Sequence, residues 1–159
     1  MKGALWITSQ INSAISSIKS PTDNQEITFK IDNIQTKIKP TFKNNRVAFQ
    51  IKSKGNAYLF SSNSNLDVKN NEMIILLQKS LNKDLANLMQ QTFQTTKQAK
   101  CDAFRLSDYL DWRYPKAWEQ LQHHWNEYYA EQLKIDIDVD IALNLSGNYY
   151  RSSERYKKN

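Results

Sequence analysis

Residues 133–145, LKIDIDVDIALNL, show the cleanest alternation of apolar and polar side chains in the chain. A period of two is typical of a β-strand that has one face against a core and the other in water. The apolar set is Ile135, Ile137, Val139, Ile141, Leu143 and Leu145. This segment is therefore predicted to be the last strand of a sheet.

An earlier segment, residues 26–39 (EITFKIDNIQTKIK), also alternates as a strand does, but its parity changes midway. The apolar residues on the two sides of the change are Ile27, Phe29 and Ile31, then Ile34 and Ile38. A β-bulge near Asp32 and Asn33 would return all of them to one face. We therefore predict one long, bulged strand here.

A second strand is predicted over residues 47–60, after the turn-rich residues 39–46 (KPTFKNNR). Its apolar residues in register are Val47, Phe49, Ile51 and Leu59, and Gly55 is expected to mark a bend. Together the two strands form a long hairpin. Residues 11–18, INSAISSI, are a further candidate strand with an ambiguous pattern.

The hydrophobic period becomes helical between about Val68 and Lys100. The apolar positions that step by three to five are Ile74, Leu77, Leu81, Leu85, Leu88 and Phe93. At about 1.5 Å per residue, such a helix reaches on the order of 45 Å, enough to cross the whole sheet. Ser107 is expected to cap a short helix, residues 108–113, and Pro115 to begin another.

The order of these elements predicts an α+β fold. About four strands, in the order β-β-β-α-α-α-β along the chain, are expected to form an antiparallel sheet. That sheet is expected to pack against one long helix and shorter C-terminal helices.

Composition narrows the class of protein. With 40% hydrophobic and 24% charged residues, the chain is typical of a soluble globular domain, and no apolar run approaches the roughly 18–20 residues of a membrane span. The net charge of +6 is uneven: residues 1–60 hold nine Lys/Arg and three Asp/Glu, whereas residues 101–150 hold four and nine. This asymmetry indicates internal charge complementarity as much as a field for a partner.

Common enzyme signatures are missing. The only glycines are Gly3, Gly55 and Gly147, and their spacing does not match the motif of a phosphate-binding or a dinucleotide-binding loop. The motifs H-E-x-x-H and G-x-S-x-G do not occur either. His123 and His124 are adjacent and would point about 100° apart on a helix, which disfavours a shared metal. The single cysteine, Cys101, has no nearby base or thiol. We predict no catalytic residue, cofactor or metal site.

Aromatic residues are dense between Asp111 and Tyr129. One helical face there would carry Trp118, Leu121, Trp125 and Tyr128, with Tyr114 extending it. Core packing is the favoured interpretation because the spacing is that of a buried stripe. An exposed platform for sugars or bases is the alternative.

Asp136, Asp138 and Asp140 imitate the start of a calcium loop, but they alternate with the apolar residues of the predicted last strand. We expect a solvated acidic stripe that forms cross-strand pairs with outward lysines of the hairpin. The candidate lysines are Lys30, Lys37 and Lys52. The idea fails if Asp138 lies on the face opposite all three.

The basic hairpin raises a second function, binding of nucleic acid or of an anionic surface. Phe29 and Phe49 share parity with the core residues, so they are not expected to form a stacking platform among the lysines. Nucleic acid is therefore not the expected partner. Docking on an anionic membrane surface stays open, and it is compatible with other functions.

The C-terminal part of the chain resembles a known family. The matching residues are Asp102 and Phe104, then Tyr114-Pro115-Lys116 with Trp118, Trp125, and the strand from Leu133 to Gly147. Upstream, GALW (Gly3 to Trp6) and KIKP (Lys37 to Pro40) also fit. This spacing resembles the C-terminal domain of the Ger(x)C family, the C subunits of bacterial spore germinant receptors. The resemblance reaches nearly the whole chain, to about Gly147.

The resemblance implies a single α+β domain over residues 1–147, followed by a basic polar tail, residues 148–159. It implies a non-enzymatic role in nutrient-triggered germination, with membrane subunits of the A and B type as partners. Tyr114, Pro115, Trp118 and Trp125 match as structural residues, and no binding residue is carried over.

Family members are longer lipoproteins on the outer leaflet of the spore's inner membrane. Their lipobox cysteine and further N-terminal domains have no counterpart among these residues, and Cys101 is not a family position. We therefore expect a soluble last domain of an anchored protein.

Overall fold

The computed structural model describes residues 2–8, 10–65, 67 and 70–144. The elements in order are α1 (Lys2–Ile7), β1 (Ser13–Lys19), β2 (Glu26–Lys43), β3 (Arg46–Ser62), α2 (Asn71–Gln98), α3 (Leu106–Arg113), α4 (Pro115–Leu121), the 3₁₀ turn η1 (Gln122–His124), α5 (Trp125–Glu131) and β4 (Lys134–Asn144). Strands and helices form the predicted α+β fold, to which the N-terminal helix α1 is an addition. The predicted tail and Leu145 lie outside the described residues.

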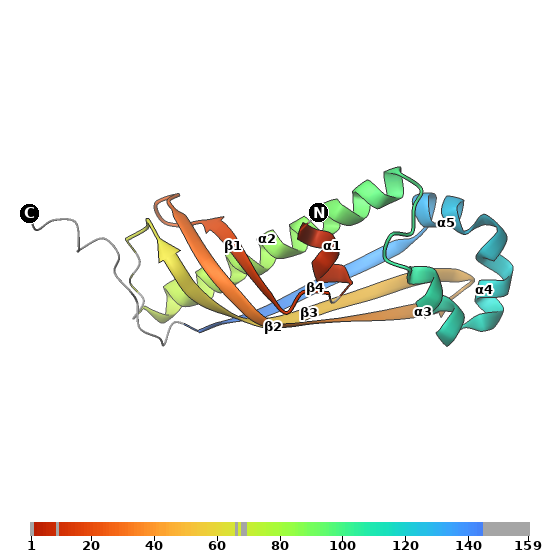
Figure 1. Cartoon of the computed structure of the whole chain (residues 1–159), viewed down its shortest axis with the longest axis horizontal. Helices are drawn as coiled ribbons and strands as arrows, with labels where there is room; N and C mark the ends of the chain where they lie inside the picture. The colour runs from red at the N-terminus through yellow and green to blue at the C-terminus, as the bar shows by residue number, and fades with distance from the viewer. Residues whose placement is uncertain (1, 9, 66, 68–69, 145–159) are drawn as a thin grey trace, which may run out of the picture.

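The four strands form one sheet in the order β1-β2-β3-β4. The first three are antiparallel, as predicted, but β4 pairs parallel with β3, so the sheet is mixed. The reason is the long helix. Helix α2 carries the chain back along the sheet, and β4 then runs in the same direction as β3 (Figure 1). A strand, a crossover helix and a parallel strand follow each other in this way in βαβ units.

The predicted bulge in β2 is confirmed. The pairing register with β3 shifts between Asp32 and Gln35, and Asn33 takes a left-handed conformation with φ of 56°. Ile31 and Ile34 are both buried as a result. Gly55 does not interrupt β3. A Cβ there would lie 3.2 Å from the Asp32 carbonyl oxygen, so close approach to the bulge favours glycine.

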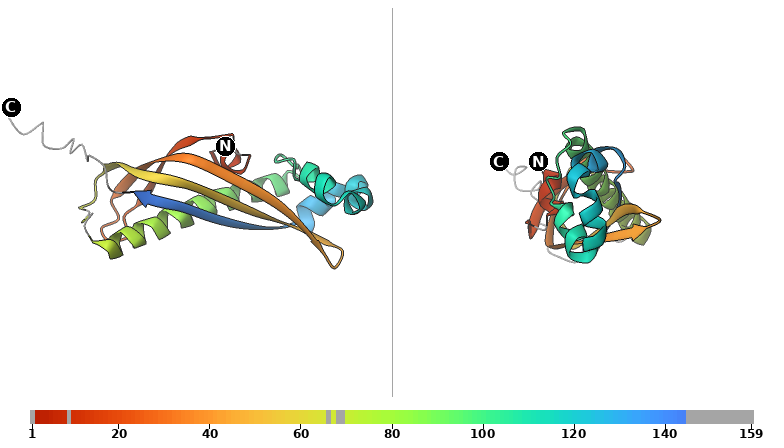
Figure 2. Two further views of the ribbon diagram at one scale, coloured as in Figure 1. Left: turned by 90° about the horizontal axis from the view of Figure 1, so that it is seen from below. Right: turned by 90° about the vertical axis from the view of Figure 1, so that its right-hand side faces the viewer.

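Helix α2 covers one face of the sheet, called the inner face below (Figure 2). Asn70 caps it, accepting from the backbone N–H groups of Glu72 and Met73 at 2.9 and 3.3 Å. Its buried residues are Leu77, Leu81, Leu85, Met89 and Phe93. Four of them belong to the predicted stripe, whereas Met89 was not predicted, and the predicted Ile74 and Leu88 are only partly buried. The buried residues of α2 pack in one core with β2 and β3 residues such as Phe29 and Phe49, which are buried as predicted.

Side chains of helix α2 also form hydrogen bonds to the edge of β4 that does not face β3. The backbone N–H of Ile141 donates to Asn82 Oδ1, and that of Leu143 donates to Gln78 Oε1, both at 3.0 Å. Side-chain amides of the helix thus take the place of a neighbouring strand along this part of the edge. Covering an edge in this way protects it from pairing with other chains.

Candidate functional site: the outward face of helix α3

The aromatic residues predicted for the core lie at one end of the sheet. Trp125 and Tyr128 are each 5% exposed and their rings stack at 6.0 Å, while Trp118 meets Trp125 edge-on at 5.5 Å. The backbone N–H of Val47 donates to the Tyr128 hydroxyl at 2.8 Å. The core interpretation is confirmed, although η1 divides the predicted helix between α4 and α5. Pro115 begins α4, as predicted.

Tyr129 belongs to the same cluster, outside the predicted stripe. It is fully buried, and its ring meets Phe93 edge-on at 5.4 Å. Its hydroxyl lies 2.6 Å from Thr96 Oγ1. Burial raises the pKa of the Tyr129 hydroxyl, since the ionised form would lose hydration, and the Asp102 carboxylate adds to the rise.

Asp102 joins this cluster to the start of α3. Its carboxylate accepts from the backbone N–H groups of Leu106 at 2.9 Å and Ser107 at 2.8 Å, and from Trp125 Nε1 at 2.9 Å. Asp102 therefore satisfies the first N–H groups of the helix. The predicted cap at Ser107 is wrong: this residue lies inside α3, and Arg105, at φ of 54°, is the residue that precedes the helix.

Helix α3 has two faces that both carry large side chains. Leu106 and Leu110 are buried in the core. The opposite side, called the α3 face below, consists of Arg105, Asp108, Tyr109 and Trp112. Asp108 and Tyr109 lie four and three residues before Trp112, the spacing of one helical side, and Arg105, which precedes the helix, pairs with Asp108. Trp112 is 84% exposed, more than the other exposed large apolar side chains of the described residues.

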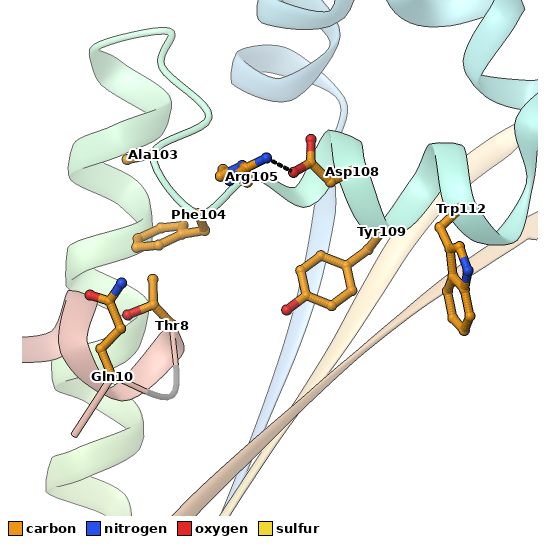
Figure 3. A pocket seen from close by; sticks show the side chains of 8 residues that line it. All are labelled: Thr8, Gln10, Ala103, Phe104, Arg105, Asp108, Tyr109 and Trp112. Atoms are coloured by element: carbon orange, nitrogen blue, oxygen red, sulfur yellow. Dashed lines mark ion pairs between the residues drawn. The ribbon is translucent and has the colours of Figure 1, made fainter. Parts of the chain in front are cut away.

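A pocket of about 480 Å³ lies between the α3 face and the end of α1. Figure 3 shows Thr8, Gln10 and Phe104 on one side of it and Tyr109 and Trp112 on the other. The Arg105 guanidinium and the Asp108 carboxylate form an ion pair at its rim (Figure 3). Concave shape, apolar rings and a few polar groups are the usual means of binding a ligand or a partner side chain.

Sequence reasoning missed this face, although a signal was present. In LSDYLDWR, Leu106 and Leu110 are four residues apart and define the buried side. That placement puts Tyr109 and Trp112 in solvent. Trp112 precedes Pro115 and therefore lies outside the aromatic stripe predicted from Pro115 onward.

The predicted acidic stripe lies on the outer face, the side of the sheet opposite α2, beside lysines of the hairpin. Asp138 pairs with Lys52 at 3.2 Å, which confirms the pairing for that lysine. Asp140 pairs with Lys54 at 3.3 Å, a pair that was not predicted. Lys30 pairs instead with Asp32 at 3.1 Å. Lys37 pairs with none of the three acids.

The remaining candidates stay apart from one another. His123 and His124 are exposed in η1, and Cys101 is an exposed free thiol. Within the described residues, no three His, Cys, Asp or Glu side chains are grouped so that they could hold a metal ion. None of the helices in the described part of the chain is both long and apolar enough to cross a membrane.

Comparison with known proteins adds a family. Residues 1–147 match the family model described as "Spore germination B3/GerAC like, C-terminal". Spore germination protein KC of Bacillus subtilis (strain 168) is 21% identical over 91% of this chain and 36% of its own length. Spore germination protein B3 of the same organism is 27% identical over 86% of this chain and 37% of its own length.

The fold also has a solved counterpart. The crystal structure of the GerBC protein superposes with a TM-score of 0.77 at 23% identity, covering 89% of this chain and 43% of that protein. At this identity the likeness concerns the fold. The chain spans little more than a third of the length of the two curated relatives.

Proposed function

Since this chain belongs to the spore germination B3/GerAC-like C-terminal family, we propose that it is a non-enzymatic domain of a germinant receptor C subunit. In this role it contributes to nutrient-triggered germination through contacts with the membrane subunits of the receptor. The match over residues 1–147 supports the assignment, and both curated relatives are named as spore germination proteins.

The α3 face is the surface we propose for those contacts, and the exposure of Trp112 is the observation that carries the choice. The Trp112 indole is 84% exposed, so in the isolated chain a large apolar surface stays in contact with water, which is unfavourable. Trp, Tyr and Arg dominate the binding energy of protein interfaces, and this face presents one of each around a pocket. A partner side chain in the pocket would remove Trp112 and Tyr109 from water while Arg105 and Asp108 stay at the rim.

The location follows from the same assignment. We propose that the domain lies at the outer leaflet of the spore's inner membrane, held by a lipid anchor on an N-terminal part of the longer protein. The greater length of the curated relatives supports a multidomain protein of this kind.

Capture of the two membrane subunits from detergent-solubilised spore membranes tests the proposal. The tagged chain, its Trp112→Ala variant and a matched Phe60→Ala variant serve as baits. Phe60 is 62% exposed on β3, away from α3, so its loss removes a similar exposed ring. We expect the wild type and Phe60→Ala to recover both subunits, identified by mass spectrometry, and Trp112→Ala to lose about tenfold or more in recovery.

Two results would count against different parts of the proposal. If the wild type recovers neither subunit, the receptor assignment is wrong. If Trp112→Ala recovers them as well as Phe60→Ala does, the receptor assignment stands and the α3 face is the wrong surface. Circular dichroism of each bait checks that all three are folded.

A further inference from the structure

On the outer face of the sheet, the sign of the charged side chains differs from strand to strand. Where β2, β3 and β4 run side by side, the outward residues of β2 include Lys37 and Lys39. Those of β3 include Lys52 and Lys54, and those of β4 are the three aspartates of the acidic stripe. The acids therefore lie next to the β3 lysines and one strand away from the β2 lysines.

Like charges face each other directly within this arrangement. Lys37 is the register partner of Lys52 across the β2–β3 ladder. Two ammonium groups in opposite positions of an antiparallel pair repel each other and destabilise the pairing. Lys52 turns to Asp138, whereas Lys37 and Lys39 form no ion pair with any other described residue.

A small pocket of about 130 Å³ opens among these side chains. Its lining residues, called the lysine cradle below, are Gln35, Lys37, Lys39, Lys52 and Lys54. Four lysine side chains and one glutamine side chain line it, and the carboxylates of Asp138 and Asp140 pair with two of the ammonium groups, those of Lys52 and Lys54. The β2 lysines thus have unused donor capacity at the rim of a concave site.

We propose that the lysine cradle binds a phosphate-type oxyanion. The charged oxygens of a tetrahedral phosphate group would accept charge-assisted hydrogen bonds from Lys37 and Lys39 and a further bond from the Gln35 amide. It would also screen the repulsion between Lys37 and Lys52. At roughly 30 Å³ per water, the pocket has room for one such group and not for a nucleotide. The group could be free phosphate or the head of an anionic lipid, and the proposal is independent of the α3 face.

Thermal unfolding in phosphate tests the site. Melting temperatures of the full chain are measured in a phosphate titration against chloride at equal ionic strength, so that general screening is constant. The variants are Lys37→Gln/Lys39→Gln and, with the same change of net charge, Lys79→Gln/Lys83→Gln on α2. We expect a saturable rise in melting temperature for the wild type and the α2 variant, and an apparent affinity about tenfold weaker for the cradle variant.

The chloride baseline gives a second reading. Because the cradle variant removes the repulsion at Lys52, we expect it to be at least as stable as the wild type in chloride. The proposal would be overturned if phosphate did not raise the melting temperature of the wild type. It would also be overturned if phosphate raised the melting temperatures of the two double variants equally and with the same apparent affinity.

Sedimentation with vesicles separates the two sources. Vesicles of phosphatidylcholine alone and vesicles with added phosphatidylglycerol are compared, with and without free phosphate. Binding to the anionic vesicles that is lost in the cradle variant and competed by phosphate identifies a lipid head group. No vesicle binding, together with the phosphate-dependent shift, identifies the free anion. Vesicle binding that the cradle variant retains contradicts a lipid site in the cradle.

Discussion

Two aspartates, Asp102 in the loop between α2 and α3 and Asp23 in the loop between β1 and β2, have similar hydrogen-bond sets in different surroundings. The two loops lie at opposite ends of the sheet (Figure 1). At the helical end, Asp102 accepts from two backbone N–H groups of α3 and from the Trp125 indole. At the far end, Asp23 accepts from the Ser64 hydroxyl and from the backbone N–H groups of Gln25 and Asn65. Two partners of Asp102, Leu106 and Trp125, are buried, and Trp125 belongs to the aromatic cluster. The partners of Asp23 lie in loops, where Gln25 and Asn65 are exposed.

This difference in burial indicates that the contribution of a carboxylate to stability does not depend on the number of its hydrogen bonds alone. A donor that is left buried and unpaired costs its full desolvation free energy, whereas an exposed donor that loses its partner can form a hydrogen bond to water instead. We therefore expect the free energy of unfolding to depend on the cluster around Asp102 and only weakly on the Asp23 network.

Replacement of Trp125 by Ala should have the largest effect, a loss of about 3–5 kcal/mol in the free energy of unfolding. The change leaves a cavity between Trp118, Tyr128 and Tyr129 and leaves one acceptor bond of Asp102 unmade. Urea unfolding measures the loss. Trp112→Ala is the matched control, and it should change the free energy by no more than about 0.5 kcal/mol because its ring is exposed.

Asp102→Ala should cost about 2–3 kcal/mol, since it removes the acceptor of two N-terminal N–H groups of α3 and of the buried Trp125 indole. Asp102→Asn, which keeps one acceptor oxygen, should lose less. Equilibrium unfolding of both variants provides the comparison. Equal losses in the two would mean that charge, and not acceptor number, sets the contribution of this residue.

Local patterns in the sequence predicted much of the fold because they depend on neighbouring residues. The parity change at Asp32–Asn33 located the bulge, and Pro115 located the start of α4. The parallel pairing of β4 was missed because alternation indicates which face of a strand is buried and not which strand lies beside it. The helix between β3 and β4 was the available signal, since such a crossover joins parallel strands.

The candidate site was harder to predict for a physical reason. Asp102 was noted as a family match, but its role as acceptor for α3 depends on a left-handed residue at Arg105 that no local pattern announces. Ser107, a good cap by type, was chosen instead. The lysine cradle depends on which residues of β2 and β3 are opposite one another, and the bulge alters that register.

Tyr129→Phe should cost about 1 kcal/mol, because it removes one hydrogen bond to Thr96 and keeps the buried ring. The substitution should also change how the stability of the fold depends on pH above about 10. The folded-state pKa of Tyr129 lies above its ordinary value of 10.0, so the wild type should lose stability as pH rises past about 10, when the unfolded chain ionises. The variant should show a shallower decline in melting temperature above pH 10. An unchanged decline would contradict the assignment to Tyr129.

Asp23→Asn should have the smallest effect and a pH dependence of opposite direction. Partial desolvation raises the pKa of Asp23, but hydrogen bonds from Ser20, Ser64 and two backbone N–H groups outweigh it and lower the pKa from 3.8 to about 2. A depressed folded-state pKa stabilises the fold above the unfolded value and not below the folded one. The difference in melting temperature between wild type and variant should therefore be constant above about pH 4 and disappear between pH 4 and pH 2.

The matched control for that measurement is Asp111→Asn, an exposed side chain on α3. It makes the same change of net charge outside the Asp23 network. If Asp23→Asn destabilises the chain as strongly as Asp102→Asn does, the contrast between the two ends is wrong. The loops around Asp23 would then contribute to cooperative unfolding as much as the aromatic cluster, and exposure would be a poor guide to the contribution of a carboxylate in this fold.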